Sequence, residues 1–220
     1  MFNHCPPTEL EELLTETKSG RRHYIVGKNS YPSITSILGA FPKPGIEKWR
    51  KRVGEEEANR ITKRSTQKGT NVHAIIEDYL NNKEIKTDNY FALENFNSVK
   101  PYLNQINNIH YLECPLYSNQ LKVAGRCDSI AEFDGTLSII DFKTSRKLKR
   151  EEWIQDYFFQ CSFYSAAYYE LTKIKAKQIV IIMAVENEEP QLFKKEVKDY
   201  LKPTISKIRK YYELYHEKNV

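Results

Sequence analysis

The sequence predicts an α/β protein in which helices flank a mixed β-sheet, with an N-terminal helical region before the sheet. Two alternating runs, Val123–Phe133 and Thr136–Phe142, are separated by Asp134-Gly135, which is one of the strongest short-range signals for a β-hairpin. The apolar run at residues 179–185 has the length and composition of a strand that is covered on both faces. Between them, the aromatic-rich residues 153–172 indicate a long buried helix.

The composition permits several functions and excludes a few. With 220 residues, the chain has the length of one domain with a real core. Its net charge of +5 and its clustered basic residues permit a nucleic-acid partner without establishing one. The first residues, MFNHCPPTELEELL, contain neither an apolar core nor a basic lead, so we expect no signal or transit peptide. No stretch approaches the roughly 20 apolar residues of a membrane span, and we expect a cytoplasmic protein without a membrane partner.

The four cysteines, Cys5, Cys114, Cys127 and Cys161, are isolated in the sequence and form no C-x-x-C pair. Their spacing predicts neither a zinc site nor a four-cysteine iron–sulfur cluster. In a cytoplasmic chain we expect them to be reduced and mostly buried.

The N-terminal part is predicted to be mainly helical. Residues 8–18 indicate a short acidic helix, capped by Thr8 and with a capping-box glutamate three residues later. A short strand is expected around residues 23–26, and a second helix after Pro32-Ser33.

A cationic helix at residues 45–52 contains Trp49 among lysines and arginines. Trp49 could stack on a base while the cations contact phosphates. Alternatively, it lies in the core beneath a solvated helix face. Residues 54–66 continue as a charged helix, and Gly69 is expected to break the chain so that a new helix begins at the next two residues.

In this middle region, His73 and Glu113 each have two possible interpretations. His73 and Glu77 are four residues apart on the new helix, so they share one face. A single helical histidine is usually structural or exposed, but the neighbouring carboxylate favours a metal ligand. After one or two helices at residues 88–108, a strand carries Glu113 between apolar residues. An inward-facing glutamate needs a partner such as a metal site, whereas on an edge strand it would face solvent.

The predicted hairpin places charged side chains together. If Asp134-Gly135 forms the loop, Ile130 lies opposite Ile139 and Asp128 lies opposite Asp141. Opposed Cβ atoms are roughly 4.5–5.5 Å apart, so two carboxylates there should raise one pKa or recruit a cation. Lys143 lies on the same face as Asp141. A divalent metal would relieve the repulsion and polarise a phosphate, and the lysine could orient or activate a water molecule. The alternative is a surface salt bridge between Asp141 and Lys143 beside an isolated Asp128.

Polar residues also follow the hairpin. Thr144 and Ser145 can donate to phosphate oxygens beside four cations, Arg146, Lys147, Lys149 and Arg150, although a solvated loop would have the same composition. In the buried helix, Gln160 and Tyr164 are four residues apart on one face, and this spacing alone indicates no function. A strand at residues 191–197 and a helix at residues 197–217 complete the chain.

Taken in order, these residues resemble a known family. The set is His73 in GTNVH, Asp128 in GRCD, Asp141-Phe142-Lys143 and Gln160-x-x-x-Tyr164. It resembles the PD-(D/E)XK nuclease superfamily in its RecB-like branch, and within that branch it is most similar to the mitochondrial genome maintenance exonucleases and their phage and bacterial relatives. The resemblance covers roughly residues 31–185.

The resemblance implies a restriction-endonuclease-like core and a role for each matching residue. Asp128, Asp141, the backbone carbonyl of Phe142 and His73 would hold Mg²⁺ or Mn²⁺, with Glu113 as a further acid. Lys143 would position the attacking water. Gln160 and Tyr164 would line the site and contact the strand. Cys127 replaces the proline frequent before the first aspartate, and Lys68 matches the basic residue that commonly precedes the histidine motif.

We therefore predict one nuclease domain over residues 1–220, with a mainly helical part at 1–108, the catalytic sheet and helix at 109–196 and a C-terminal helix at 197–220. The expected function is a metal-dependent, single-stranded DNA exonuclease acting in DNA processing, repair or replication. Trp49, Lys68, Thr144 and Ser145 would help to bind the strand. We expect a monomer without an iron–sulfur cluster, in a bacterial cell or a phage-infected host, and the sequence identifies no protein partner.

Four other functions compete with this prediction. A structure-specific or restriction-type endonuclease could use the same site. An iron–sulfur nuclease is excluded because no cysteine follows Cys161. A DNA-binding module without catalysis would bind tightly without turnover, and a structural metal protein leaves Lys143, Gln160 and Tyr164 unexplained.

Overall fold

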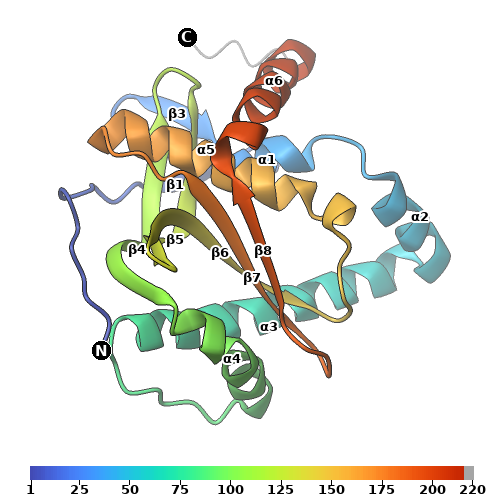
Figure 1. Cartoon of the computed structure of the whole chain (residues 1–220). Coiled ribbons are helices and arrows are strands. Elements are labelled where there is room, and N and C mark those ends of the chain that lie inside the picture. Colours follow the sequence, from blue (N-terminus) through green and yellow to red (C-terminus); the bar gives the residue numbers. More distant parts are fainter. Residues whose placement is uncertain (216–220) are drawn as a thin grey trace.

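Figure 1 shows the computed structural model, which describes residues 1–215. A five-stranded sheet lies between two layers of helices. Its strands, in spatial order, are β4 (Ile106–Ser118), β5 (Val123–Phe133), β6 (Thr136–Ser145), β7 (Gln178–Val185) and β8 (Gln191–Glu196). The β6–β7 pair is parallel and the other three pairs are antiparallel. The predicted mixed sheet flanked by helices is therefore confirmed.

Strand β7 separates two hydrophobic cores. Ile179, Ile181, Met183 and Val185 belong to one core, and the residues between them, Val180, Ile182 and Ala184, belong to the other. Successive side chains on a strand point to opposite faces. A run without polar residues is therefore what a strand covered on both faces requires.

Two helices cover each face of the sheet. Helices α5 (Gln155–Thr172) and α6 (Val197–Tyr215) lie on one face, and α3 (Glu55–Leu80) and α4 (Tyr90–Leu103) lie on the other. The short 3-10 helix η1 (Glu151–Trp153) leads into α5. The last two residues of the helix predicted at 197–217 lie outside the described part. Within the described part, no helix is long and apolar enough to cross a membrane.

The prediction of a helix at residues 8–18 is wrong. Residues 6–14 form no helix, and β1 (Thr15–Lys18) joins β2 (Arg21–Val26) and β3 (Asn29–Pro32) in a small antiparallel sheet where a single strand was predicted. Long-range contacts hold the segment extended. The Thr8 carbonyl accepts a 2.6 Å hydrogen bond from the Tyr111 hydroxyl, and Glu12 pairs with Arg126 at 2.6 Å. These tertiary contacts override a weak local preference for helix.

The predicted break at Gly69 is also wrong, because α3 runs without interruption through this residue. A Cβ at Gly69 would lie 3.5 Å from Thr144 Oγ1, so α3 passes close to the end of β6 at this point. The Thr70 hydroxyl donates to the Thr66 carbonyl inside the helix instead of capping a new one. The single long helix therefore joins the cationic N-terminal region to His73.

The remaining N-terminal elements follow the sequence pattern. Helix α1 (Ile34–Gly39) begins after Ser33, whose side chain caps it, and α2 (Pro44–Val53) has no buried residue. Cys114, Cys127 and Cys161 are buried, Cys5 is exposed, and all four are free thiols, as expected.

Candidate active site

The β5–β6 hairpin has the predicted register only up to the site. Phe133 pairs with Thr136, Ile130 with Ile139 and Ser129 with Ile140, and the ladder ends there. Asp128 does not form the expected ladder pair with Asp141. Instead, its Oδ2 accepts a 2.8 Å hydrogen bond from the backbone N–H of Phe142.

A shift in side-chain alternation explains this difference. Cys127 and Ile130 are three residues apart, yet both belong to the core on the α5 side of the sheet. Regular alternation of side chains would place them on opposite faces of the sheet. The alternation is therefore interrupted at the two residues between them. The Asp128 carboxylate consequently lies where β5 and β6 separate, and it replaces a ladder carbonyl as the partner of Phe142.

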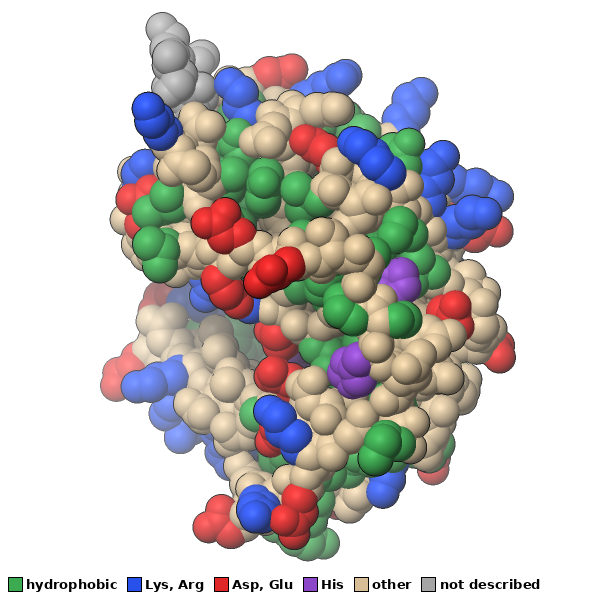
Figure 2. Space-filling model, turned by 90° about the vertical axis from the view of Figure 1, so that its left-hand side faces the viewer, with side chains coloured by type: hydrophobic (Ala, Val, Ile, Leu, Met, Phe, Trp, Pro, Cys, Tyr) green, Lys and Arg blue, Asp and Glu red, His purple; other side chains and the backbone are tan. Residues whose placement is uncertain are grey.

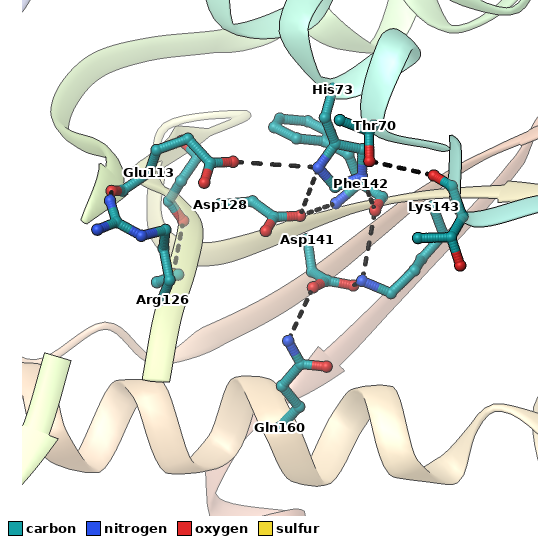
Figure 3. A network of polar contacts seen from close by, with 12 residues as sticks. Thr70, His73, Glu113, Arg126, Asp128, Asp141, Phe142, Lys143 and Gln160 are labelled. Atoms are coloured by element: carbon teal, nitrogen blue, oxygen red, sulfur yellow. Dashed lines mark hydrogen bonds and ion pairs between the residues drawn. The ribbon is translucent and has the colours of Figure 1, made fainter. Parts of the chain in front are cut away.

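Glu113 faces this gap from β4. It lies between the ladder pairs Leu112–Ser129 and Cys114–Cys127, and its φ of 47° is in the left-handed region. Arg126 Nη1 donates to the Glu113 carbonyl (Figure 3). The same guanidinium binds Glu12, which fixes the turn of the strand. Few non-glycine residues adopt a positive φ. The left-handed backbone conformation at Glu113 directs its carboxylate inward. Sequence reasoning missed Arg126, which is signalled only by its position two residues before Asp128.

His73 reaches the same gap from α3 on the other side (Figure 3). Its Nε2 donates to the Phe142 carbonyl at 2.7 Å, which leaves Nδ1 as the free ring nitrogen. Nδ1 lies 3.7 Å from Asp128 Oδ2 and 4.0 Å from Glu113 Oε1. A carbonyl that fixes the tautomer of a histidine in this way is typical of metal-binding histidines.

One oxygen or nitrogen atom each from His73, Glu113 and Asp128 lies within 4.8 Å of the others. Burial, and then repulsion by Asp128, raises the pKa of Glu113 to about 7. Two carboxylates and one imidazole that converge on one point can hold a divalent cation. Glu113 thus faces inward, and His73 lies beside the two carboxylates.

Asp141 and Lys143 form a second, deeper part of the site. Asp141 is 1% exposed and contacts Lys143 Nζ in an ion pair, while Gln160 Nε2 donates to its Oδ1 at 3.4 Å. Burial raises the pKa of Asp141 to about 7, although the lysine opposes this shift. Burial lowers the pKa of Lys143, but the carboxylates of Asp141 and Asp128 outweigh that effect and keep it above its ordinary value. The alternative of a surface salt bridge is therefore wrong.

One predicted ligand and two predicted strand contacts have other partners in the structure. The Phe142 carbonyl accepts from His73 Nε2 and lies 3.3 Å from Lys143 Nζ. Tyr164 is 2% exposed, within the core, and accepts from Gln160, which is itself 9% exposed. These two residues support Asp141 from below and do not present a surface to a strand.

The other residues predicted to bind DNA are each partly exposed. Thr144 and Ser145 are half-buried at the end of β6, and Trp49 is half-buried on α2, outside the core. Lys68 is occupied by a 2.9 Å ion pair with Glu186. Figure 2 shows one face of the molecule with a hollow whose edge carries acidic side chains. Such a surface repels phosphates unless cations bind to it.

Comparison with known proteins agrees with this geometry. A sequence model of the PD-(D/E)XK nuclease superfamily matches residues 84–214, which include Glu113 and the whole β5–β6 hairpin. The chain belongs to the PD-(D/E)XK nuclease superfamily. Asp128 and Asp141-Phe142-Lys143, from which the resemblance was inferred, lie within the matched residues. PD-(D/E)XK nucleases use divalent metals.

Three proteins illustrate the similarity. The chain is 29% identical over 160 residues to mitochondrial genome maintenance exonuclease 1 of Mus musculus, covering 66% of this chain and 47% of that protein. It is 28% identical over 133 residues to the Homo sapiens protein of the same name, covering 56% and 39%. The chain thus spans less than half the length of these relatives. A crystal structure of a candidate exonuclease from Eubacterium rectale is 14% identical, with a TM-score of 0.48, and the match covers 66% of this chain and 64% of that one.

We expect Gly125→Ala to destabilise this PD-(D/E)XK nuclease by about 1–3 kcal/mol, because the extra methyl group overpacks the core. The new Cβ would lie 2.8 Å from Tyr164 Cε1 and 3.2 Å from Ile34 Cγ2. Urea denaturation measures the change. Gly39→Ala is the matched control, since a Cβ there meets no atom within 4 Å. Equal midpoints for the two variants would show that Tyr164 is not held rigidly beneath the site.

Proposed function

We propose that this nuclease is a metal-dependent exonuclease that hydrolyses phosphodiester bonds in single-stranded DNA, in DNA processing, repair or replication. One observation carries the proposal: a cluster of two carboxylates and an imidazole lies beside a buried aspartate–lysine pair. The relatives named as exonucleases support the reaction type.

His73, Glu113 and Asp128 would hold Mg²⁺ or Mn²⁺, and Asp141 would join them by releasing one carboxylate oxygen from Lys143. When bound, the cation polarises the phosphate and lowers the pKa of a bound water. These oxygen-rich ligands fit Mg²⁺ and Mn²⁺ better than softer metals.

Side chains of the protein carry out the remaining steps of the hydrolysis. Lys143 is a cation whose Nζ lies 3.3 Å from the Phe142 carbonyl, which also binds His73 of the acidic cluster. From there it orients the attacking water and stabilises the negative charge that develops on the phosphate oxygens. The water oxygen forms a bond to phosphorus and gives up one proton to solvent, the bond to the leaving oxygen breaks, and that oxygen takes up one proton from solvent, so one water molecule is consumed. Gln160 keeps Asp141 in position through its side-chain amide.

The preference for a single strand rests on α2 and α3. Trp49 is half-buried among the exposed cations Lys48, Lys51 and Arg52. An aromatic ring beside exposed cations suits a single strand, whose bases can stack while its phosphates meet positive charge. Thr144 and Ser145 follow Lys143 directly on β6 and would donate to the strand's phosphates. For Ser145 this means exchanging the 2.6 Å hydrogen bond that its hydroxyl donates to the Lys147 carbonyl.

Digestion of labelled linear and circular single-stranded DNA tests the proposal. With Mg²⁺ or Mn²⁺ we expect the linear strand to be degraded and the circle to survive, and EDTA should stop the reaction. Cleavage of circles would identify an endonuclease. Firm binding without turnover in any metal would leave a DNA-binding module, and a duplex substrate of the same sequence measures the strand preference.

A further inference from the structure

A second site lies apart from the acidic cluster, between α3 and the loop that follows β6. We propose that it binds a phosphate of the DNA strand and so sets which bond reaches the metal site. A cavity of about 390 Å³ is lined there by four cations, Arg60, Arg64, Lys68 and Arg146, and by two acids, Glu57 and Glu186. The proposal rests on DNA being the substrate.

The pairing of charges in this cavity leaves two cations available. Arg60 binds Glu57 at 2.7 Å, and Lys68 binds Glu186 at 2.9 Å, so both acids are neutralised. Within residues 1–215, Arg64 and Arg146 form no hydrogen bond or ion pair. Two exposed guanidinium groups from different elements therefore share one concave surface, with no internal partner for either among the described residues.

The chemistry of the guanidinium group selects the ligand. Its planar set of N–H donors matches the oxygens of a phosphate and can bind two of them at once. The Ser65 side chain lines the same cavity and adds a hydroxyl donor. Two such cations repel each other, and an anion held between them removes that repulsion. A phosphodiester or a terminal phosphate of the substrate has the required charge and geometry.

The position of the cavity relates it to the metal site. Arg64 precedes His73 by nine residues on the continuous α3, which is about 13 Å along the helix axis. Arg146 follows Lys143 by three residues, which is at most about 10 Å along the chain. Phosphates of one strand are about 3.4 Å apart along a stacked helix and further apart when extended. The bound phosphate is therefore roughly two to four nucleotides from the bond that is cut.

The test combines a double variant with single neutral linkages in the DNA. We expect Arg64→Ala/Arg146→Ala to raise KM about tenfold with kcat changed less than twofold, as suits charged hydrogen bonds that position the strand. The control Lys202→Ala/Arg209→Ala removes the same charge from exposed positions of α6, on the opposite face of the sheet. Arg64→Lys/Arg146→Lys keeps the charge but loses the two-pronged geometry and should recover only part of the affinity.

Methylphosphonate linkages, placed one at a time, locate the phosphate. For wild type, we expect one internal position two to four nucleotides from the cut to raise KM about tenfold, and the double variant should not respond at that position. An effect of a 5′ or 3′ terminal phosphate, and of no internal linkage, would assign the site to the strand end. Equal KM values for the double variant and its control, or a uniform response at every linkage, would overturn the proposal.

If the proposed nuclease function is wrong, the experiment gives a different result from the one expected if only the phosphate site is wrong. If wild type does not cut, fluorescence anisotropy of the same oligonucleotides without metal still tests the site. Weaker binding of the unmodified strand by the double variant, together with a loss of wild-type binding at one linkage position only, would support the phosphate site and refute the proposed reaction. Unchanged binding would refute the site itself.

Discussion

Lys143→Met should reduce nuclease activity at saturating metal by at least about 100-fold, the effect expected when a preorganised charge at the reacting phosphate is lost. Methionine keeps most of the length and apolar stem of the side chain but cannot donate to water or to the phosphate. Metal binding should persist, because His73, Glu113 and Asp128 remain. Initial rates on end-labelled single-stranded DNA measure the loss.

The same change should cost stability, on the order of 3 kcal/mol, because it leaves Asp141 buried without its cation. A second variant separates this effect from catalysis. Asp141→Asn/Lys143→Met removes both charges, so it should recover most of the stability measured by urea denaturation and remain inactive. Gln160 can still donate to the introduced asparagine, because its side-chain amide retains an oxygen acceptor where Asp141 Oδ1 lies.

Lys202→Met is the control for this pair of experiments. Lys202 is exposed on α6, so its loss should change neither activity nor stability. Activity of Lys143→Met within about tenfold of wild type would refute the role assigned to the lysine. The buried ion pair would then be a structural feature only.

Asp128→Asn should weaken Mn²⁺ binding by more than about 100-fold, since loss of even an outer partner of a metal ligand costs 10–100-fold. The variant should fold, because the asparagine carbonyl can accept from the Phe142 N–H as Asp128 Oδ2 does. The expected loss therefore reports the charge of the ligand and not the hairpin. Isothermal titration calorimetry with Mn²⁺ measures the affinity directly, without reference to activity.

Asp88→Asn provides the matched control, because Asp88 is exposed in the loop between α3 and α4. Its Mn²⁺ affinity should equal that of wild type. If Asp128→Asn also binds with wild-type affinity, the cluster of His73, Glu113 and Asp128 is not the principal cation site. Binding by Asp141 and its neighbours would then be the next arrangement to test.

The sequence by itself determined those elements whose conformation depends on the residues within them. The hairpin turn is the best example: Asp134 and Gly135 have φ values of 52° and 74°, and these residue types tolerate the positive φ that such a turn requires. The apolar run of β7 and the aromatic run of α5 likewise identify elements that are largely buried. The ordered set of His73, the hairpin acids and lysine, Gln160 and Tyr164 was enough to identify the family.

Only the tertiary structure decided how these residues meet. His73 and Lys143 both reach the Phe142 carbonyl, and Arg126 holds the left-handed turn at Glu113. The His73 contact joins α3 to β6 across 69 residues and the Arg126 contact joins β5 to β4, and no local preference encodes them. The extended residues 6–14 and the unbroken α3 at Gly69 have the same origin. A weak local preference of a fraction of a kcal/mol per residue yields to long-range packing and hydrogen bonds, so the sequence determined the chemistry of the site and the packing decided its geometry.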